Sequence, residues 1–230
     1  MADDTSVTPV RVRNRRGEGD RLRQEIVTAA ADLLEETGDE SAITLRSVAR
    51  RVGIAAPSIY RHFPDQPAIM LAVVRSAFAE LNEQLGVAVE AAGEMPRERL
   101  MALCQAYLEF GQAHPGRYRT MFGGLWIPDL GESSVTQDDM ATLGQESLQG
   151  LARALEACVA AGCATSTDVA ADTVALWLGL HGLAHQRAVS PSFAWPSDIA
   201  ERVITALAHF TDAADATDVT DAMDVTPRRT

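Results

Sequence analysis

The sequence predicts an all-α protein, and three observations lead to that prediction. Apolar residues recur at steps of three and four along most of the chain, a pattern typical of amphipathic helices. No run alternates between apolar and polar residues over the length of a strand. Of the 230 residues, 47% are hydrophobic, which is enough for one or two domains with a real core. We therefore expect an N-terminal three-helix domain followed by a larger C-terminal helical domain.

The first helices can be placed from their apolar stripes and capping residues. One stripe predicts a helix from Arg21 to about Gly38. Thr44 is a suitable N-cap for the next helix, because its hydroxyl can accept a hydrogen bond from the first turn. Asp65 can cap in the same way a long helix that continues through Leu85.

Gly93 and Pro96 separate these helices from a second set. The apolar periodicity places the further helices at about 97–113, 116–123, 137–161, 168–188 and 196–213, with irregular chain at 124–135 and 190–195. The domains we expect are a flexible basic arm (1–20), a helix-turn-helix domain (21–67), a helical domain (68–213) and a disordered acidic tail (214–230).

Residues 45–63 are the segment around which the N-terminal part is organised. They read as two short helices that meet at Gly53, where the chain must reverse, and their apolar residues share one face. The polar residues left on the outer face include cations, hydroxyls and an imidazole but no carboxylate. This face therefore indicates an anionic partner. Its members are Arg46, Arg50, Arg51, Ser58, Tyr60, Arg61 and His62.

The charge distribution supports the same location for an anionic partner. The chain has a formal net charge of −12, from 20 basic residues, all of them arginine, and 32 acidic ones. Residues 1–63 hold 10 arginines and 10 acids, so the whole excess of negative charge lies after residue 63. A contact with a polyanion thus belongs to the first third of the chain. The N-terminal segment contains four closely spaced arginines and is either a solvated tail or a basic arm that lies along DNA. These residues are Arg11, Arg13, Arg15 and Arg16.

Several other classes of protein are disfavoured. The three cysteines have no CxxC spacing, so neither a disulfide framework nor a zinc site is implied. His181 and His185 could share a metal, but no third ligand stands at matching spacing, and we expect no metal or other cofactor. We find no secretion signal and no apolar run long enough for a membrane span, and expect a cytoplasmic protein with no membrane partner. Motifs of hydrolases and nucleotide-binding enzymes are missing, so we expect no enzyme.

The run TLRSVARRVGIAAPSIYRHF, from Thr44 to Phe63, resembles the N-terminal DNA-binding domain of the tetracycline-repressor (TetR) family. The resemblance extends over about residues 21–75 and implies a helix-turn-helix whose second helix reads an operator in double-stranded DNA. Two positions depart from the family pattern. Ala55 replaces a serine that would cap the reading helix, and Gln66 replaces a lysine that would hold a phosphate. The DNA-binding residues implied are Arg46, Ala56, Pro57, Ser58, Tyr60, Arg61, His62 and Gln66.

The helix predicted at 168–188 has two sides that could be buried. Val174, Trp177 and His181 belong to one stripe, and a stripe of small residues that includes Gly179 lies on nearly the opposite side. Small residues let another helix approach closely, and the last predicted helix offers an apolar face. In the resembled family the last two helices of each subunit form a four-helix dimer interface. The resemblance therefore implies a homodimer through the last two helices.

The block WLGLHG, Trp177 to Gly182, also resembles the tryptophan-histidine-glycine (WHG) class of C-terminal domains in that family. Together with aromatic and methionine residues earlier in the chain, it predicts a cavity for an unidentified, largely apolar small-molecule effector. Each of these side chains could instead simply fill the core. The residues expected to bind the ligand are Tyr107, Phe110, His114, Met121, Phe122, Trp126, Trp177 and His181.

These features lead to one functional hypothesis and two alternatives. We expect a ligand-responsive DNA-binding transcriptional regulator, a repressor that releases its operator when the effector binds the C-terminal domain. The alternatives are a helical carrier of small molecules and an enzyme, each without a role at DNA. Either one would leave the cationic N-terminal face unexplained.

Overall fold

The computed structural model describes residues 18–123 and 126–211, and within these ranges every regular element is a helix. The all-α class is therefore confirmed. The first part contains α1 (Glu18–Thr37), the short 3-10 helix η1 (Glu40–Ala42), α2 (Leu45–Val52), α3 (Ala56–Ile59) and α4 (Gln66–Ala91). The second part contains α5 (Pro96–Ala113), α6 (Pro115–Phe122), α7 (Gln137–Ala141), α8 (Gln145–Ala160), α9 (Val169–Val189) and α10 (Ile199–Leu207).

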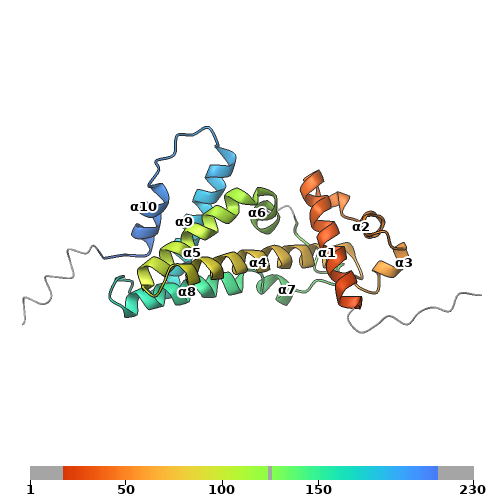
Figure 1. The fold of residues 1–230 in the computed structure, drawn as a ribbon. Coiled ribbons are helices and arrows are strands. Elements are labelled where there is room, and N and C mark those ends of the chain that lie inside the picture. The colour runs from red at the N-terminus through yellow and green to blue at the C-terminus, as the bar shows by residue number, and fades with distance from the viewer. Residues whose placement is uncertain (1–17, 124–125, 212–230) are drawn as a thin grey trace, which may run out of the picture.

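Helix α4 connects two separate hydrophobic cores. Figure 1 shows it running from the group of α1, α2 and α3 into the group that contains α5, α8 and α9. Ile69 and Val73, near its start, are buried with α1, α2 and α3. Leu81 and Leu85, further along, are buried with α5, α8 and α9. The cores thus divide inside α4, between Val73 and Leu81, whereas the domain boundary that we predict at residue 67 lies at its first turn.

The second core is a stack of helices around α5. Leu100 and Phe110 of α5 are fully buried, as are Leu155 of α8 and Leu176 of α9. Helix α10 closes one side of α9, where Gly179 allows a close approach: a Cβ at position 179 would lie 2.3 Å from a Leu207 methyl carbon. The small-residue face of α9 is therefore covered by the last helix of the same chain.

The helix predicted at 137–161 is wrong in one respect, because two helices occupy this range. Gly144 lies between α7 and α8 with a φ of +74°, a conformation that favours glycine and ends α-helical geometry. The end predicted at residue 213 is also wrong. Helix α10 ends at Leu207 because the next residues turn to pair with the α8–α9 connection, where the Thr165 N–H donates to the His209 carbonyl at 2.9 Å.

The predicted terminal segments fall mostly outside the described residues. The basic arm (1–20) does so up to residue 17, while residues 18–20 belong to α1. The acidic tail (214–230) lies wholly outside them. Among the described helices, none is both long enough and apolar enough to cross a membrane.

Candidate functional site

The α2–α3 hairpin is held by caps at each of its turns. Thr44 accepts a hydrogen bond from the Ser47 N–H, and the Ser47 hydroxyl accepts one from the Thr44 N–H, so the two form a capping box at the start of α2. Gly53 ends α2 with a φ of +77°, as its position at the reversal predicts, and the Ile54 N–H donates to the Ala49 carbonyl at 2.9 Å. These contacts fix the angle between the two helices.

Helix α3 is only one turn long and lacks a side-chain cap, because Ala55 stands at its N-cap. The chain continues as a turn in which the Phe63 N–H donates to the Ile59 carbonyl at 3.0 Å. Both of these residues are buried against α1 and α4. We call α3 and the turn that follows it, residues 56–63, the reading segment. Because this segment makes few hydrogen bonds of its own, the burial of Ile59 and Phe63 holds it in place.

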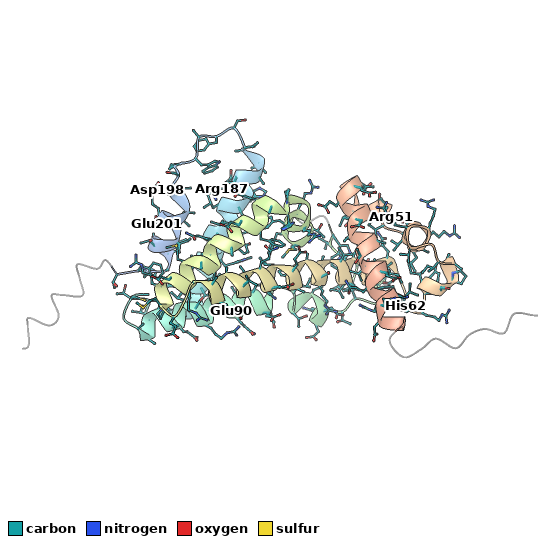
Figure 2. All side chains as sticks on the ribbon, viewed as in Figure 1. Arg51, His62, Glu90, Arg187, Asp198 and Glu201 are labelled. Carbon is teal, nitrogen blue, oxygen red and sulfur yellow. The ribbon has the colours of Figure 1, made fainter. Side chains whose placement is uncertain are left out.

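The DNA-binding residues expected from the sequence lie on or beside this hairpin. Tyr60 is 58% exposed, and Arg46, Pro57 and Arg61 are exposed as well. Ala56, Ser58 and His62 are half-buried on the same short segment. Figure 2 places Arg51 and His62 at the α1–α3 end of the molecule, and Glu90, Asp198 and Glu201 toward the other end. The α2–α3 hairpin thus presents cations and hydroxyls together at one end of the molecule.

Two polar residues at this end are engaged within the domain. The Arg51 guanidinium pairs with the Glu36 carboxylate of α1 through both of its terminal nitrogens, which raises the pKa of Arg51 and lowers that of Glu36. The Gln66 side-chain amide donates to the Glu40 carbonyl at 3.0 Å. Gln66 is one of the predicted DNA contacts, and in this structure its side chain ties the start of α4 to η1.

A first cavity of about 270 Å³ lies in the second core between α4, α5, α8 and α9. Phe78, Leu81 and Leu85 contribute one wall from α4. Tyr107 and Trp177 line it from α5 and α9. The chain around the Gly144 break closes it, with Ala141, Leu143, Gly144, Gln145, Ser147 and Leu148.

A second cavity of about 330 Å³ adjoins the first, since Phe122, Leu143 and Trp177 line both. Its other walls include Met121 and Trp126. His181, one turn after Trp177 on α9, also lines it, and the two rings stack with their centroids 5.7 Å apart. Six of the eight expected ligand-binding residues therefore line one or both cavities: Tyr107, Met121, Phe122, Trp126, Trp177 and His181.

The other two expected residues line neither cavity. Phe110 is fully buried and packs on the His114 ring, with centroids 5.1 Å apart. The Nε2 atom of His114 lies 3.4 Å from the amide nitrogen of Gln84 on α4. Phe110 and His114 thus pack between the end of α5 and its neighbouring helices and do not face either cavity.

A chain of hydrogen bonds behind the cavity walls links Tyr107, which lines the first cavity, to His181, which lines the second. The Tyr107 and Tyr118 hydroxyl oxygens are 3.2 Å apart, and the Tyr118 hydroxyl lies 2.7 Å from Nδ1 of His181. Burial raises the pKa of Tyr107 far above its usual range and that of Tyr118 to about 12. Burial, reinforced by the nearby His185, lowers the pKa of His181, so its imidazole is neutral at pH 7.

Sequence reasoning missed several cavity residues. Phe78 is one of the apolar residues of the long helix predicted to continue through Leu85. Its position in the sequence does not distinguish a cavity-lining residue from an ordinary core residue. Leu143 and Gly144 were placed inside a continuous helix, so their position at a break was not expected. A glycine within a helical pattern is the one signal that could have indicated it.

Comparison with known proteins identifies both halves of the chain. A family model described as "Bacterial regulatory proteins, tetR family" matches residues 26–73, and one described as "Tetracyclin repressor-like, C-terminal domain" matches residues 100–210. The chain belongs to the tetR family of bacterial regulatory proteins. The first match ends at the residue where the first core ends within α4.

The chain is also similar to a curated protein and to solved structures. The nucleoid occlusion factor SlmA of Vibrio atlanticus is 29% identical over 101 residues, which are 44% of this chain and 51% of SlmA. The chain therefore spans about half the length of the curated relatives it matches. A solved structure of a protein of unknown function from Rhodococcus sp. RHA1 is 28% identical, with a TM-score of 0.67 over 81% of this chain and 91% of that one. A TetR/AcrR-family transcriptional regulator from Thermobifida fusca, 22% identical, shares the fold with a TM-score of 0.58 over 82% of this chain and 97% of its own.

Proposed function

We propose that this tetR-family protein is a dimeric transcriptional repressor of the cytoplasm. It binds an operator in double-stranded DNA and releases it when a largely apolar small molecule enters the C-terminal cavities. The observation that carries the proposal is the placement of α4. Ile69 and Val73 in its first turns complete the core under the reading segment, and Phe78 and Leu81 form a wall of the first cavity.

DNA binding is assigned to the outer face of α2 and α3. Arg46 lies on the supporting helix and Tyr60 at the end of the reading segment, and both are exposed. Guanidinium and hydroxyl groups of this kind donate hydrogen bonds to phosphate oxygens and fix the register of a reading helix in the major groove. His62, two residues after Tyr60, extends the same edge.

Three contacts support a path from the cavities to this face in addition to α4 itself. Trp126 lines the second cavity and also packs against the first core. Ser134 donates to the Asp65 carboxylate, and Arg75 of α4 forms an ion pair at 2.8 Å with Asp139 of α7. A ligand that displaces Trp126 or α7 would therefore move the first turns of α4.

The dimer is assigned to α9 and α10. Val174, Leu178 and Val189 of α9 are exposed by 43%, 54% and 57% of their surface, and their spacing places them on one side of the helix. A two-fold pairing of these helices would set the two reading segments one turn of DNA apart, about 34–36 Å. Movement of α4 would then change this separation and lower operator affinity.

We also assign the C-terminal domain to the tryptophan-histidine-glycine class, as the block Trp177 to Gly182 suggests. Its tryptophan and histidine stack on each other beside Phe122, at the boundary of the two cavities. In this assignment the block supplies ligand contacts from one side of α9, while the exposed side remains for the dimer.

A gel-shift experiment tests the proposal. The full chain is titrated into duplex DNA from upstream of its own gene and into a scrambled duplex of equal length, at one stated salt concentration. We expect a clear preference for the upstream DNA. Equal affinity for both duplexes would refute the operator assignment, and ligand binding without any DNA binding would favour the carrier alternative.

A further inference from the structure

One polar side chain of the second cavity, His181, determines what the two adjoining cavities can hold. We infer that they select an uncharged, mainly apolar ligand with one hydrogen-bond acceptor, such as a ketone, ester or ether oxygen, bound by Nε2–H of His181. This inference rests on the proposed function, because it concerns the effector of the same site. Beyond the proposed function, it specifies the charge of the effector and the protein atom that binds it.

The lining contains no charged side chain. The first cavity is walled by aromatic and aliphatic residues, with Tyr107, Gln145 and Ser147 as the polar exceptions. In the second cavity the polar exceptions are Thr120 and His181. A carboxylate or ammonium group that entered would lose its hydration without gaining an opposite charge, which strongly disfavours binding. A neutral ligand avoids this cost.

The hydrogen bonds beneath the lining have a fixed direction. Among the described residues, the buried Tyr107 hydroxyl has one hydrogen-bond partner, the Tyr118 hydroxyl, so its proton would have no acceptor if it pointed elsewhere. Tyr107 therefore donates its proton to Tyr118, at 3.2 Å, and this bond lowers the pKa of Tyr118 against the effect of burial. Tyr118 in turn donates to Nδ1 of His181 at 2.7 Å.

This direction determines the tautomer of His181. A neutral imidazole whose Nδ1 accepts a hydrogen bond carries its proton on Nε2. Among the described residues, Nε2 of His181 has no hydrogen-bond partner. The ring is held by stacking on Tyr118 and Trp177, with centroids 5.7 Å away in each case. The second cavity is thus lined by the oriented Nε2–H of His181 among mostly apolar and aromatic walls.

The two cavities assign different parts of the ligand. The apolar part occupies the first cavity, where Leu81, Leu85 and Leu151 provide contacts without polar atoms. The hydrogen-bond acceptor of the ligand lies in the second cavity. Phe122 separates the first cavity from His181, and the ring centroids of Phe122 and His181 are 5.0 Å apart. A hydrogen bond made in such a site corresponds to about ten-fold in affinity.

The test uses 2-decanone, decanoate, decylammonium and 1-decene, four chains of ten carbons that differ in their polar group. Their dissociation constants are measured with the full-length protein without DNA, by calorimetry and from tryptophan fluorescence, to which Trp126 and Trp177 of the cavity lining contribute. We expect 2-decanone to bind at least about ten-fold more tightly than decanoate or decylammonium. Equal or tighter binding of decanoate, or no binding of any probe, would overturn the inference.

Variants separate the hydrogen bond from general packing. His181→Phe keeps an aromatic ring and should weaken 2-decanone about ten-fold while leaving 1-decene unchanged. Gln186→Phe, at an exposed position of α9 that lines neither cavity, is the control and should change neither. Tyr118→Phe removes the donor to Nδ1 and should reduce the preference for the ketone over 1-decene, which keeps the test informative if His181→Phe does not fold. Unchanged ketone affinity in both folded variants would contradict the inference.

The outcome is distinguishable from failure of the proposed function. If 2-decanone binds as expected but does not release the operator in a gel shift, the ligand class holds and the repressor mechanism fails. If decanoate binds more tightly and releases the operator, the mechanism holds and the ligand class fails.

Discussion

The Asp65 carboxylate joins the first turn of α4 to the segment that precedes α7 through its contacts with Ser134. Its Oδ1 accepts from the Ala68 N–H at 2.8 Å and from the Ser134 hydroxyl at 3.0 Å, and its Oδ2 accepts from the Ser134 N–H at 2.7 Å. One side chain thus caps the helix that carries the DNA-binding core and binds a loop that begins at the second cavity. This double role allows the two effects to be separated by substitution.

Asp65→Ser should weaken the coupling between ligand and operator. Serine can still cap α4, but its shorter side chain cannot reach Ser134 as well. We expect operator affinity without ligand to stay within about two-fold, and the ligand-induced loss of affinity to fall several-fold. Gel shifts with and without ligand measure both values. Ser134→Ala, which removes one of the two bonds, should give an intermediate loss, and full coupling in both variants would exclude this path.

Arg46→Ala and Tyr60→Ala should weaken operator binding without unfolding the protein. Both side chains are exposed and outside the buried core. Loss of one phosphate contact should lower operator affinity by about 1–2 kcal/mol. For Arg46→Ala, the slope of log affinity against log salt concentration should also fall by about one. Arg21→Ala, an exposed arginine on α1, serves as the control and should have less effect. Two unchanged binding curves would refute the site assignment.

Deletion of residues 1–16 should also lower operator affinity and flatten its salt dependence. The cluster Arg11 to Arg16 lies outside the described residues, but its charge would replace the phosphate contact that Gln66 does not supply. Binding measured at several salt concentrations gives the slope for both forms of the protein. An identical slope after deletion would show that the hairpin is sufficient on its own.

Gly144→Ala should destabilise the C-terminal domain. Its φ of +74° disfavours any side chain, and an added Cβ would lie 3.0 Å from the Phe78 ring. We expect a loss of about 1–2 kcal/mol in the free energy of unfolding, measured with urea. Gly150→Ala, in the middle of α8 with only the Arg153 side chain at 3.9 Å from the added Cβ, should be neutral or stabilising by about 0.5–1 kcal/mol. The opposite order of the two variants would contradict this account of the break.

Stability should fall as the pH drops below 6.5, in part because of His181. Burial and His185 lower its pKa from the ordinary value of 6.5. Since the unfolded chain then binds this proton more tightly than the folded one, the stabilisation is present above pH 6.5 and is lost as pH falls toward the lower folded-state pKa. Urea midpoints at pH about 7.5 and about 5.5 should differ less in His181→Phe than in the original protein. An equal difference would assign the effect to other groups.

The sequence was sufficient for the features that depend on local chemistry. Thr44, Gly53 and Asp65 could be assigned as caps because each acts on backbone groups a few residues away. The cationic face of residues 45–63 followed from residue types alone. By contrast, the engagement of Gln66 with Glu40, separated by 26 positions, depends on how η1 packs against α4, which no local pattern encodes.

The cavities were predictable in kind but not in detail. Aromatic residues at helical spacing indicated that space exists among α5, α6 and α9, and six of the expected residues line it. Phe110 and His114 carry the same sequence signal and point elsewhere, because residue type does not reveal which side of α5 faces the gap. Tyr118 carries the same sequence signal, but its position between Tyr107 and His181 is apparent only from its distances to them.

The break at Gly144 has a consequence for how such a protein can diversify. Many of the side chains that surround the first cavity belong to the short stretch from Ala141 to Leu148, which lies outside the α1–α3 core and outside the exposed face of α9. Substitutions there could retune the chemical preference of the sensor while the operator it reads and the subunit it pairs with stay the same. A descendant protein could thereby acquire a new inducer within an unchanged regulatory circuit.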